Sequence, residues 1–179
     1  MKRVHLAMAR VTPLLGMLVA AATAAPAAEP GPACAPVLKA MTRTLETDHA
    51  TVSTSNGETN NGITAGGVNY LQVGGAWRMS GLSPRDNQQR FAENLRNAKS
   101  FTCQPLPDST LEGAPVFSYR TITETDDAVT ESTVSVLKSS GLAVAVENTT
   151  TERNGPKSHY VTKYSYTGIR APTIQKQAD

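Results

Sequence analysis

The chain has 179 residues, with 17 basic and 15 acidic side chains and a formal net charge of +2. This length suits one domain built around one core. Three of the basic residues, Lys2, Arg3 and Arg10, lie in the first ten positions, so residues 25–179 carry 14 basic and 15 acidic side chains, a net charge of −1. A near-neutral domain lacks the basic surface that phosphate backbones require, which argues against a nucleic-acid partner.

The first 24 residues have the layout of a secretory signal peptide. Basic residues precede an uncharged, mostly apolar stretch from Val11 to Ala22, and the small residues Ala22 and Ala24 suit signal peptidase. The stretch is shorter than the roughly 20 apolar residues that span a bilayer, so no transmembrane segment is expected in the mature protein. We predict a signal peptide over residues 1–24, a periplasmic or secreted mature protein, and a Pro/Ala-rich tether over residues 25–33.

Helical spacing begins after the tether. Apolar residues at helical intervals predict a helix over residues 35–48; they are Val37, Leu38, Met41 and Leu45. Residues 50–55 are rich in Thr, Ser and Val and predict an extended segment. The turn dipeptides Asn56-Gly57 and Asn61-Gly62 are expected to close it.

A hairpin and a second helix follow. Residues 68–73 and 76–80 flank Gly74-Gly75, which suits a tight turn. Ser83 can cap a helix that begins with Pro84 and carries Asp86 in its first turn, and this helix is predicted to run to about residue 98. Its thin apolar stripe places it on the surface.

The second half of the chain predicts long antiparallel strands in a meander. Thr-, Val- and Tyr-rich runs are separated by turn residues at regular intervals. The expected strands cover residues 101–106, 114–124, 128–138, 142–152 and 158–168.

Cys34 and Cys103 are the two cysteines of the chain. In an exported protein an even pair predicts a disulfide. The closed loop would contribute about 4 kcal/mol on the chain-entropy model. Two free thiols or a metal pair is the alternative, but no His or Asp cluster accompanies either cysteine.

No catalytic motif is evident. The mature chain offers His49 and His159 as bases, a G-x-S-x-G turn is absent, and neither histidine has zinc-ligand spacing. The acidic residues 124–127 could bind calcium, but they fall where a hairpin must turn. We therefore expect no enzyme activity, no cofactor and no metal. Asn148 begins a glycosylation sequon that matters only in a host that attaches glycans.

Several short motifs, together with the order of elements, resemble the LolA/LolB-like superfamily of periplasmic proteins, and most closely its uncharacterised bacterial members. The motifs are Cys34-Ala35-Pro36-Val37, Gly75-Ala76-Trp77, Cys103 and Ser140-Gly141-Leu142. The resemblance implies an α+β domain over residues 34–172, with residues 173–179 as a flexible tail. Its sheet would be strongly curved, antiparallel and incompletely closed, a half-barrel whose concave face is covered by helices.

The resemblance also implies a function. The protein would be a non-enzymatic periplasmic binding protein that holds a lipid-like or other apolar ligand, or an apolar protein segment, in the curved sheet. The alternative is a structural or interaction module of the cell envelope with a packed interior and no ligand. Which face of each strand points inward stays open, because a one-residue slip exchanges the faces. The candidate ligand-binding residues are Leu38, Met41, Leu45, Val68, Tyr70, Trp77, Met79, Phe117, Tyr119, Leu142, Val144, Tyr164 and Tyr166.

Overall fold

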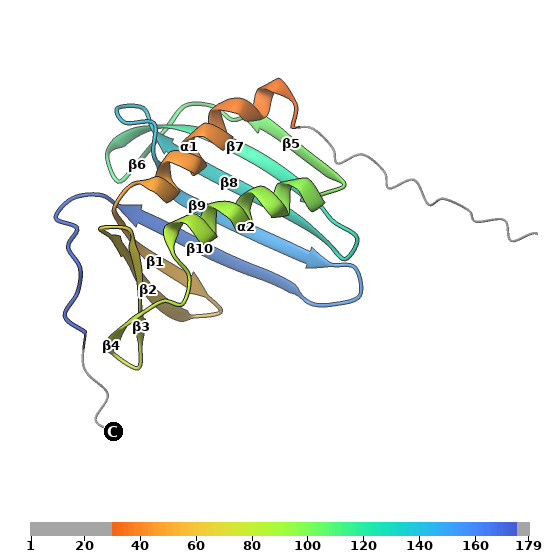
Figure 1. The fold of residues 1–179 in the computed structure, drawn as a ribbon. Helices are drawn as coiled ribbons and strands as arrows, with labels where there is room; N and C mark the ends of the chain where they lie inside the picture. Colours follow the sequence, from red (N-terminus) through yellow and green to blue (C-terminus); the bar gives the residue numbers. More distant parts are fainter. Residues whose placement is uncertain (1–29, 175–179) are drawn as a thin grey trace, which may run out of the picture.

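The structure is a computed structural model that describes residues 30–174 as one ten-stranded antiparallel sheet with two α-helices (Figure 1). The predicted signal peptide and most of the predicted tether lie outside the described residues. In chain order the elements are η1 (Pro32–Cys34), α1 (Ala35–Glu46), β1 (His49–Ser55), β2 (Glu58–Ala65), β3 (Val68–Val73), β4 (Ala76–Met79), α2 (Pro84–Asn97), β5 (Ser100–Pro105), β6 (Ser109–Leu111), β7 (Ala114–Glu124), β8 (Ala128–Leu137), β9 (Ala143–Glu152) and β10 (Lys157–Ser165).

Both predicted helices form, and their ends have local causes. α1 ends two residues earlier than expected because Thr47 has extended backbone angles, while its N–H bonds to the Arg43 carbonyl oxygen. α2 begins with the predicted capping box, in which Ser83 and Asp86 satisfy each other's backbone N–H groups. α2 has no buried residue, which confirms its surface position.

The strands before and after α2 belong to the same sheet. The strand order is β4-β3-β2-β1-β10-β9-β8-β7-β5, with β6 also paired to β7. β1 pairs with β10 from Ala50 opposite Ser165 to Ser55 opposite Tyr160. The extended segments predicted before the second helix and the long strands predicted after it are therefore joined in one sheet.

The predicted turn at Asn61-Gly62 is wrong, because β2 continues through both residues. Gly62 lies opposite Thr51 of β1, and a Cβ atom at Gly62 would lie 2.5 Å from Thr51 Oγ1. A side chain at position 62 would therefore force the Thr51 hydroxyl to move, which favours glycine here. The predicted turn at Asn56-Gly57 is confirmed, with positive φ angles at both residues joining β1 to β2.

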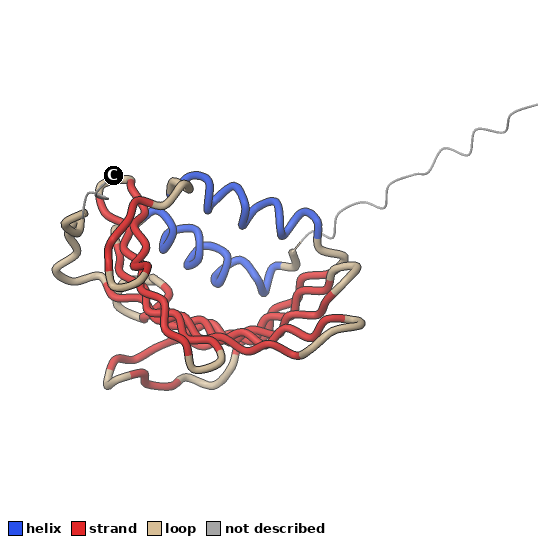
Figure 2. Tube along the Cα trace, turned by 90° about the horizontal axis from the view of Figure 1, so that it is seen from below, coloured by secondary structure: helices blue, strands red, loops and turns tan. Residues whose placement is uncertain are grey.

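The sheet is curved and open, and the predicted α+β class is confirmed. Figure 2 shows both helices on the side toward which the sheet bends; this side is called the inner face below. The buried core lies between α1 and β8–β9. It consists of Cys34, Val37, Ala40, Val134, Val136, Ala143 and Val146. Within residues 30–174 no helix has the length and apolarity needed to cross a membrane.

The predicted disulfide between Cys34 and Cys103 is present, with the two Cα atoms 5.1 Å apart. It joins the start of α1 to the edge strand β5. Cys34 is 1% exposed, so the bond is part of the core.

Candidate ligand-binding hollow

A cavity of about 440 Å³ lies between the two helices and the inner face of the sheet, and is called the hollow below. Residues of α1, α2 and β5 and of the strands β7 to β10 contribute to its lining. They are Val37, Leu38, Met41, Phe91, Asn94, Leu95, Asn97, Phe101, Thr121, Thr123, Thr125, Thr130, Ser132, Val134, Val146, Asn148, Tyr160, Thr162 and Tyr164.

The helices form a mostly apolar roof. α1 contributes Val37, Leu38 and Met41, whose three- and four-residue spacing puts them on one side of the helix. α2 contributes Phe91 and Leu95 by the same spacing, with two asparagines beside them. The roof can therefore contact an apolar chain along most of its length.

The sheet forms the floor of the hollow, and the side chains of this floor change from apolar to polar along the strands. Residues directly opposite each other in antiparallel strands point to the same side. Val134 of β8 and Val146 of β9 form such a pair near α1. Two positions along the strands, the row consists of Thr121, Ser132, Asn148 and Tyr160. The row next to the β7–β8 turn begins with Thr123 and Thr130, so this end of the floor presents hydroxyl groups.

The polar floor groups are partly paired with one another. Ser132 Oγ donates to Asn148 Oδ1 at 2.6 Å, and the hydroxyls of Ser53 and Thr162 lie 2.9 Å apart. Asn148 Nδ2 donates no hydrogen bond to a described residue, so it can donate to a molecule in the hollow. No Asp, Glu, Lys, Arg or His is found among the described residues of the lining.

Two tyrosines of β10, Tyr160 and Tyr164, contribute to the lining of the hollow. Burial raises the pKa of Tyr164 to about 12, with smaller contributions from Tyr166 and Tyr160. The pKa of Tyr160 is also raised by burial. Both phenols therefore stay uncharged at neutral pH and can act as hydrogen-bond donors. The Tyr164 ring packs edge-on against His49, with 5.5 Å between the ring centroids.

A hydrogen-bond network joins α1 to the start of β9 and to the segment that follows β10. Thr44 is fully buried, and its Oγ1 accepts a bond of 2.9 Å from the Ala143 N–H. The Tyr166 hydroxyl donates to the Ala143 carbonyl oxygen and lies 3.2 Å from Thr44 Oγ1. These bonds hold α1 at a set position above the floor.

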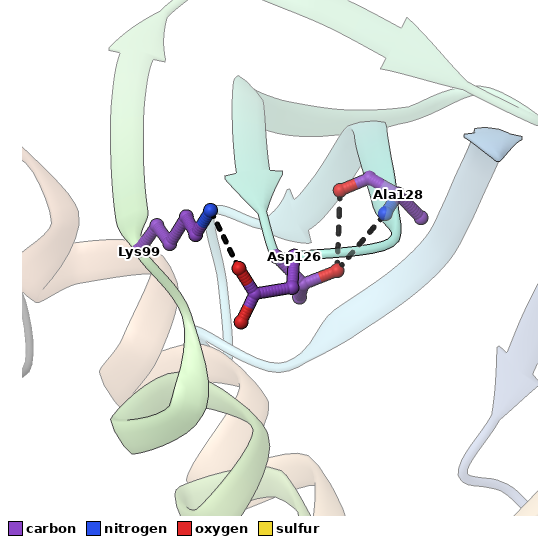
Figure 3. A network of polar contacts seen from close by, with 4 residues as sticks. Lys99, Asp126 and Ala128 are labelled. Carbon is purple, nitrogen blue, oxygen red and sulfur yellow. Dashed lines mark hydrogen bonds and ion pairs between the residues drawn. The ribbon is translucent and has the colours of Figure 1, made fainter. Parts of the chain in front are cut away.

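α2 is attached to the sheet by its two ends. Before the helix, Asn69 Nδ2 donates to the Leu82 carbonyl oxygen at 2.9 Å. After it, the Lys99 N–H donates to the Glu124 carbonyl oxygen at 2.8 Å, and the Lys99 ammonium lies 2.6 Å from an Asp126 carboxylate oxygen (Figure 3). The contact with Lys99 lowers the pKa of Asp126. Between these two attachments α2 lies above the hollow, and none of its residues is fully buried.

The structure brings some of the predicted site residues together. Leu38, Met41 and Tyr164 line the hollow, and Leu45 lies in an adjoining groove between the helices. Tyr119 packs against the core beside the hollow. Phe117 shares the face of Tyr119 but is 43% exposed, with the Lys138 ammonium above its ring.

Four predicted residues lie on the opposite face of the sheet, which corrects their inward placement. Tyr70 is paired with Met79, and Trp77 with Gln72, whereas the neighbouring Leu71 pairs with Gly62 on the inner face. The alternation along β3 therefore turns Val68 and Tyr70 away from the helices. Met79 is 61% exposed on this outer side.

The last three candidates lie outside the lining of the hollow. Leu142 is buried just before β9. Val144 lies at a shift in the pairing of β8 with β9, where Ser135 is opposite Ala145 and Val136 is opposite Ala143. It therefore has no partner on β8. Tyr166 belongs to the network with Thr44.

The sequence reasoning missed the larger part of the hollow. The Thr- and Ser-rich runs predict strands, and the thin apolar stripe with Phe91 and Leu95 predicts a surface helix; neither pattern predicts a lining. One available signal was the alternation of Thr and Ser at positions 121, 123, 125, 130 and 132, which predicts a polar row on one face of a hairpin.

The weaker alternatives from the sequence have structural explanations. The Asp126 carboxylate contacts Lys99, and His159 Nε2 lies 2.9 Å from Glu147 on the outer face. Asn148 of the sequon is 7% exposed and faces the hollow, where a glycan could not be attached in the folded chain. Among residues 30–174 no group of three or more His, Cys, Asp or Glu is placed to hold a metal.

No protein-family model and no curated protein matches the sequence. Two solved structures are similar to the chain. The crystal structure of LprF from Mycobacterium bovis has a TM-score of 0.47 at 10% identity, and covers 85% of this chain and 100% of its own. That of the lipoprotein LppX from Mycobacterium tuberculosis has a TM-score of 0.46 at 8% identity, and covers 77% and 97%. Neither singles out the LolA/LolB-like proteins, so that resemblance stays a hypothesis.

Proposed function

We propose that this protein is a non-enzymatic binding protein that holds the apolar chain of an uncharged amphipathic ligand in the hollow. The observation that supports this most is the cavity of about 440 Å³ between an apolar roof and a hydroxyl-bearing floor. Ligand pockets in proteins occupy roughly 300–1,000 Å³ and combine apolar walls with a few polar groups. For comparison, an apolar cavity of about 150 Å³ accommodates benzene.

The size of the hollow favours this function over a packed structural module. In a packed interior, roof and floor would interdigitate and α2 would bury side chains against the sheet. Instead, α2 buries none, and Phe91 and Leu95 face open space. Apolar side chains held over an unfilled space gain contacts when a ligand fills it.

The lining favours an uncharged ligand. Moving an ionised group out of water costs several kcal/mol or more unless a partner compensates for it. The described lining residues offer hydroxyl, amide and phenol groups but no charged side chain. We infer that hydroxyl, ester or amide groups of the ligand lie on the polar floor, while its chain contacts Leu38, Met41 and Phe91.

The finer parts of the proposal rest on the sequence and its resemblance. These are a LolA/LolB-like half-barrel whose concave face is covered by helices, a location in the periplasm or outside the cell, and an apolar protein segment as another possible occupant. The disulfide supports the location, because such bonds persist in oxidising compartments.

A tryptophan reporter inside the hollow tests the proposed function. Trp77 is the single tryptophan of the chain and lies on the outer face, so it cannot report binding. The variant Trp77→Phe/Phe91→Trp moves the reporter to the roof. Titration with monoacylglycerols should shift its emission to the blue and raise the melting temperature, with about 2.7 kcal/mol of stabilisation at a free ligand concentration one hundred times Kd.

The unmodified protein is the matched control. Its Trp77 emission should stay constant, while its melting temperature rises as in the variant. If monoacylglycerols of every chain length leave both the Phe91→Trp emission and the melting temperature unchanged, the binding function is refuted and the packed envelope module replaces it.

A further inference from the structure

A second apolar space lies between α1 and α2. This helix groove has a volume of about 360 Å³. α1 contributes Thr42 and Leu45 to it, and α2 contributes Gln88 and Ala92. None of these four residues belongs to the described lining of the hollow, so the groove is a space of its own.

The hollow and the helix groove are separated by a single layer of side chains. Leu38 of α1 and Phe91 and Leu95 of α2 line both spaces. No backbone of a third element contributes to the described lining of the groove. The two spaces therefore adjoin along these three side chains.

The side chains in this layer have room to move. α2 buries no residue and is attached to the sheet at its ends, through Asn69 and Lys99. Leu38, Phe91 and Leu95 are only partly buried. A chain that enters between them replaces water at surfaces that are already apolar.

We propose that the helix groove is a second compartment of the same binding site and takes the distal part of an apolar chain that is too long for the hollow. This inference rests on the proposed function. The shared residues identify the occupant, because a chain bound in the hollow already contacts Leu38, Phe91 and Leu95. The polar residues of the groove, Thr42 and Gln88, are uncharged, as in the hollow.

Chain-length dependence tests the inference. Kd is measured for monoacylglycerols from octanoyl to icosanoyl with the unmodified protein, with Ala92→Trp and with Gln89→Trp. Ala92 is exposed and lines the groove but not the hollow, so tryptophan there fills the groove and leaves the floor of the hollow unchanged. Gln89 is exposed on the same helix outside both spaces and provides the matched control.

In the unmodified protein, Kd should fall by about threefold to fourfold for each added methylene, including chains longer than the hollow holds. Ala92→Trp should bind the short chains with unchanged Kd and gain nothing from the longer ones. Gln89→Trp should follow the unmodified protein throughout.

Three outcomes would overturn the inference in different ways. If affinity levels off at the same chain length in all three proteins, the groove is not part of the site, although the hollow still binds. If Ala92→Trp changes the oligomeric state in sedimentation and leaves the chain-length profile unchanged, the groove holds a second copy of the chain. If no monoacylglycerol binds at any length, the proposed function itself fails.

Discussion

At the level of single residues, Tyr164 connects the hollow to the rest of the protein. Its ring packs against buried His49, and its side chain contributes to the uncharged lining of the hollow. Burial is the main reason that its pKa is raised to about 12. This shift has a consequence for stability, because the unfolded chain releases the same proton at a pH near 10.

We predict that the stability provided by neutral Tyr164 is complete below pH 10 and is lost as the pH rises toward 12. In this window the unfolded state binds fewer protons than the folded state, so the free energy of unfolding falls, by about 2 to 3 kcal/mol in total. Urea unfolding at several pH values measures this loss. Tyr164→Phe should reduce the slope, and Tyr160→Phe, whose side chain is more exposed, should reduce it less; equal slopes in all three proteins would contradict the assignment.

The residue level is also where sequence reasoning reached its limit. The two-residue spacing of Phe117 and Tyr119 places them on one face, and the pairing with β8 makes this the inner face. The inward candidates Tyr70 and Met79 lie on the outer face, because the choice between two faces depends on the pairing of β3 with β2 and β4. The local sequence shows which residues alternate, but it does not show which of the two sets faces inward.

At the level of elements, the helices and the long strands were predictable because their signals are local. The Ser83 capping box, the Gly74-Gly75 turn and the strand Ala114–Glu124 all depend on residues close in sequence. The pairing of β1 with β10 joins residues more than one hundred positions apart. Such pairing has no local signal, so a continuous sheet with a space above it was expected only from the resemblance and not from the residues themselves.

The disulfide provides the prediction that belongs to this level. It fixes the start of α1 to β5, and it closes a loop with a sequence separation of 69. Replacing both cysteines in Cys34→Ala/Cys103→Ala should lower the free energy of unfolding by up to about 4 kcal/mol, since the unfolded chain regains the entropy of the open loop.

Urea unfolding compares this variant with the unmodified protein, before and after reduction. The reduced, alkylated unmodified protein should lose about as much stability as the variant, which separates loss of the bond from loss of side-chain packing. Unchanged midpoints in both would show that the bond adds nothing to the fold.

At the level of the whole molecule, the resemblance implied the α+β class, whereas nothing in the sequence predicted the volume of the hollow. The volume depends on how far α2 stands from a floor of Thr, Ser and Asn side chains. That distance is set by attachments such as Asn69 to Leu82 and Lys99 to Asp126, which join segments distant in sequence. Neither pair contains a motif that sequence reasoning could have used.

Export is the remaining prediction for the whole chain, and it concerns residues outside 30–174. The basic start, the apolar stretch and the small residues Ala22 and Ala24 predict that the mature protein begins at Ala25. An oxidising compartment would also account for the closed Cys34–Cys103 bond. Amino-terminal sequencing and intact mass of protein from the periplasm or medium should give a chain starting at Ala25. Ala22→Leu/Ala24→Leu removes the small residues and should leave the precursor uncut, and an unmodified protein that still begins at Met1 would refute the prediction.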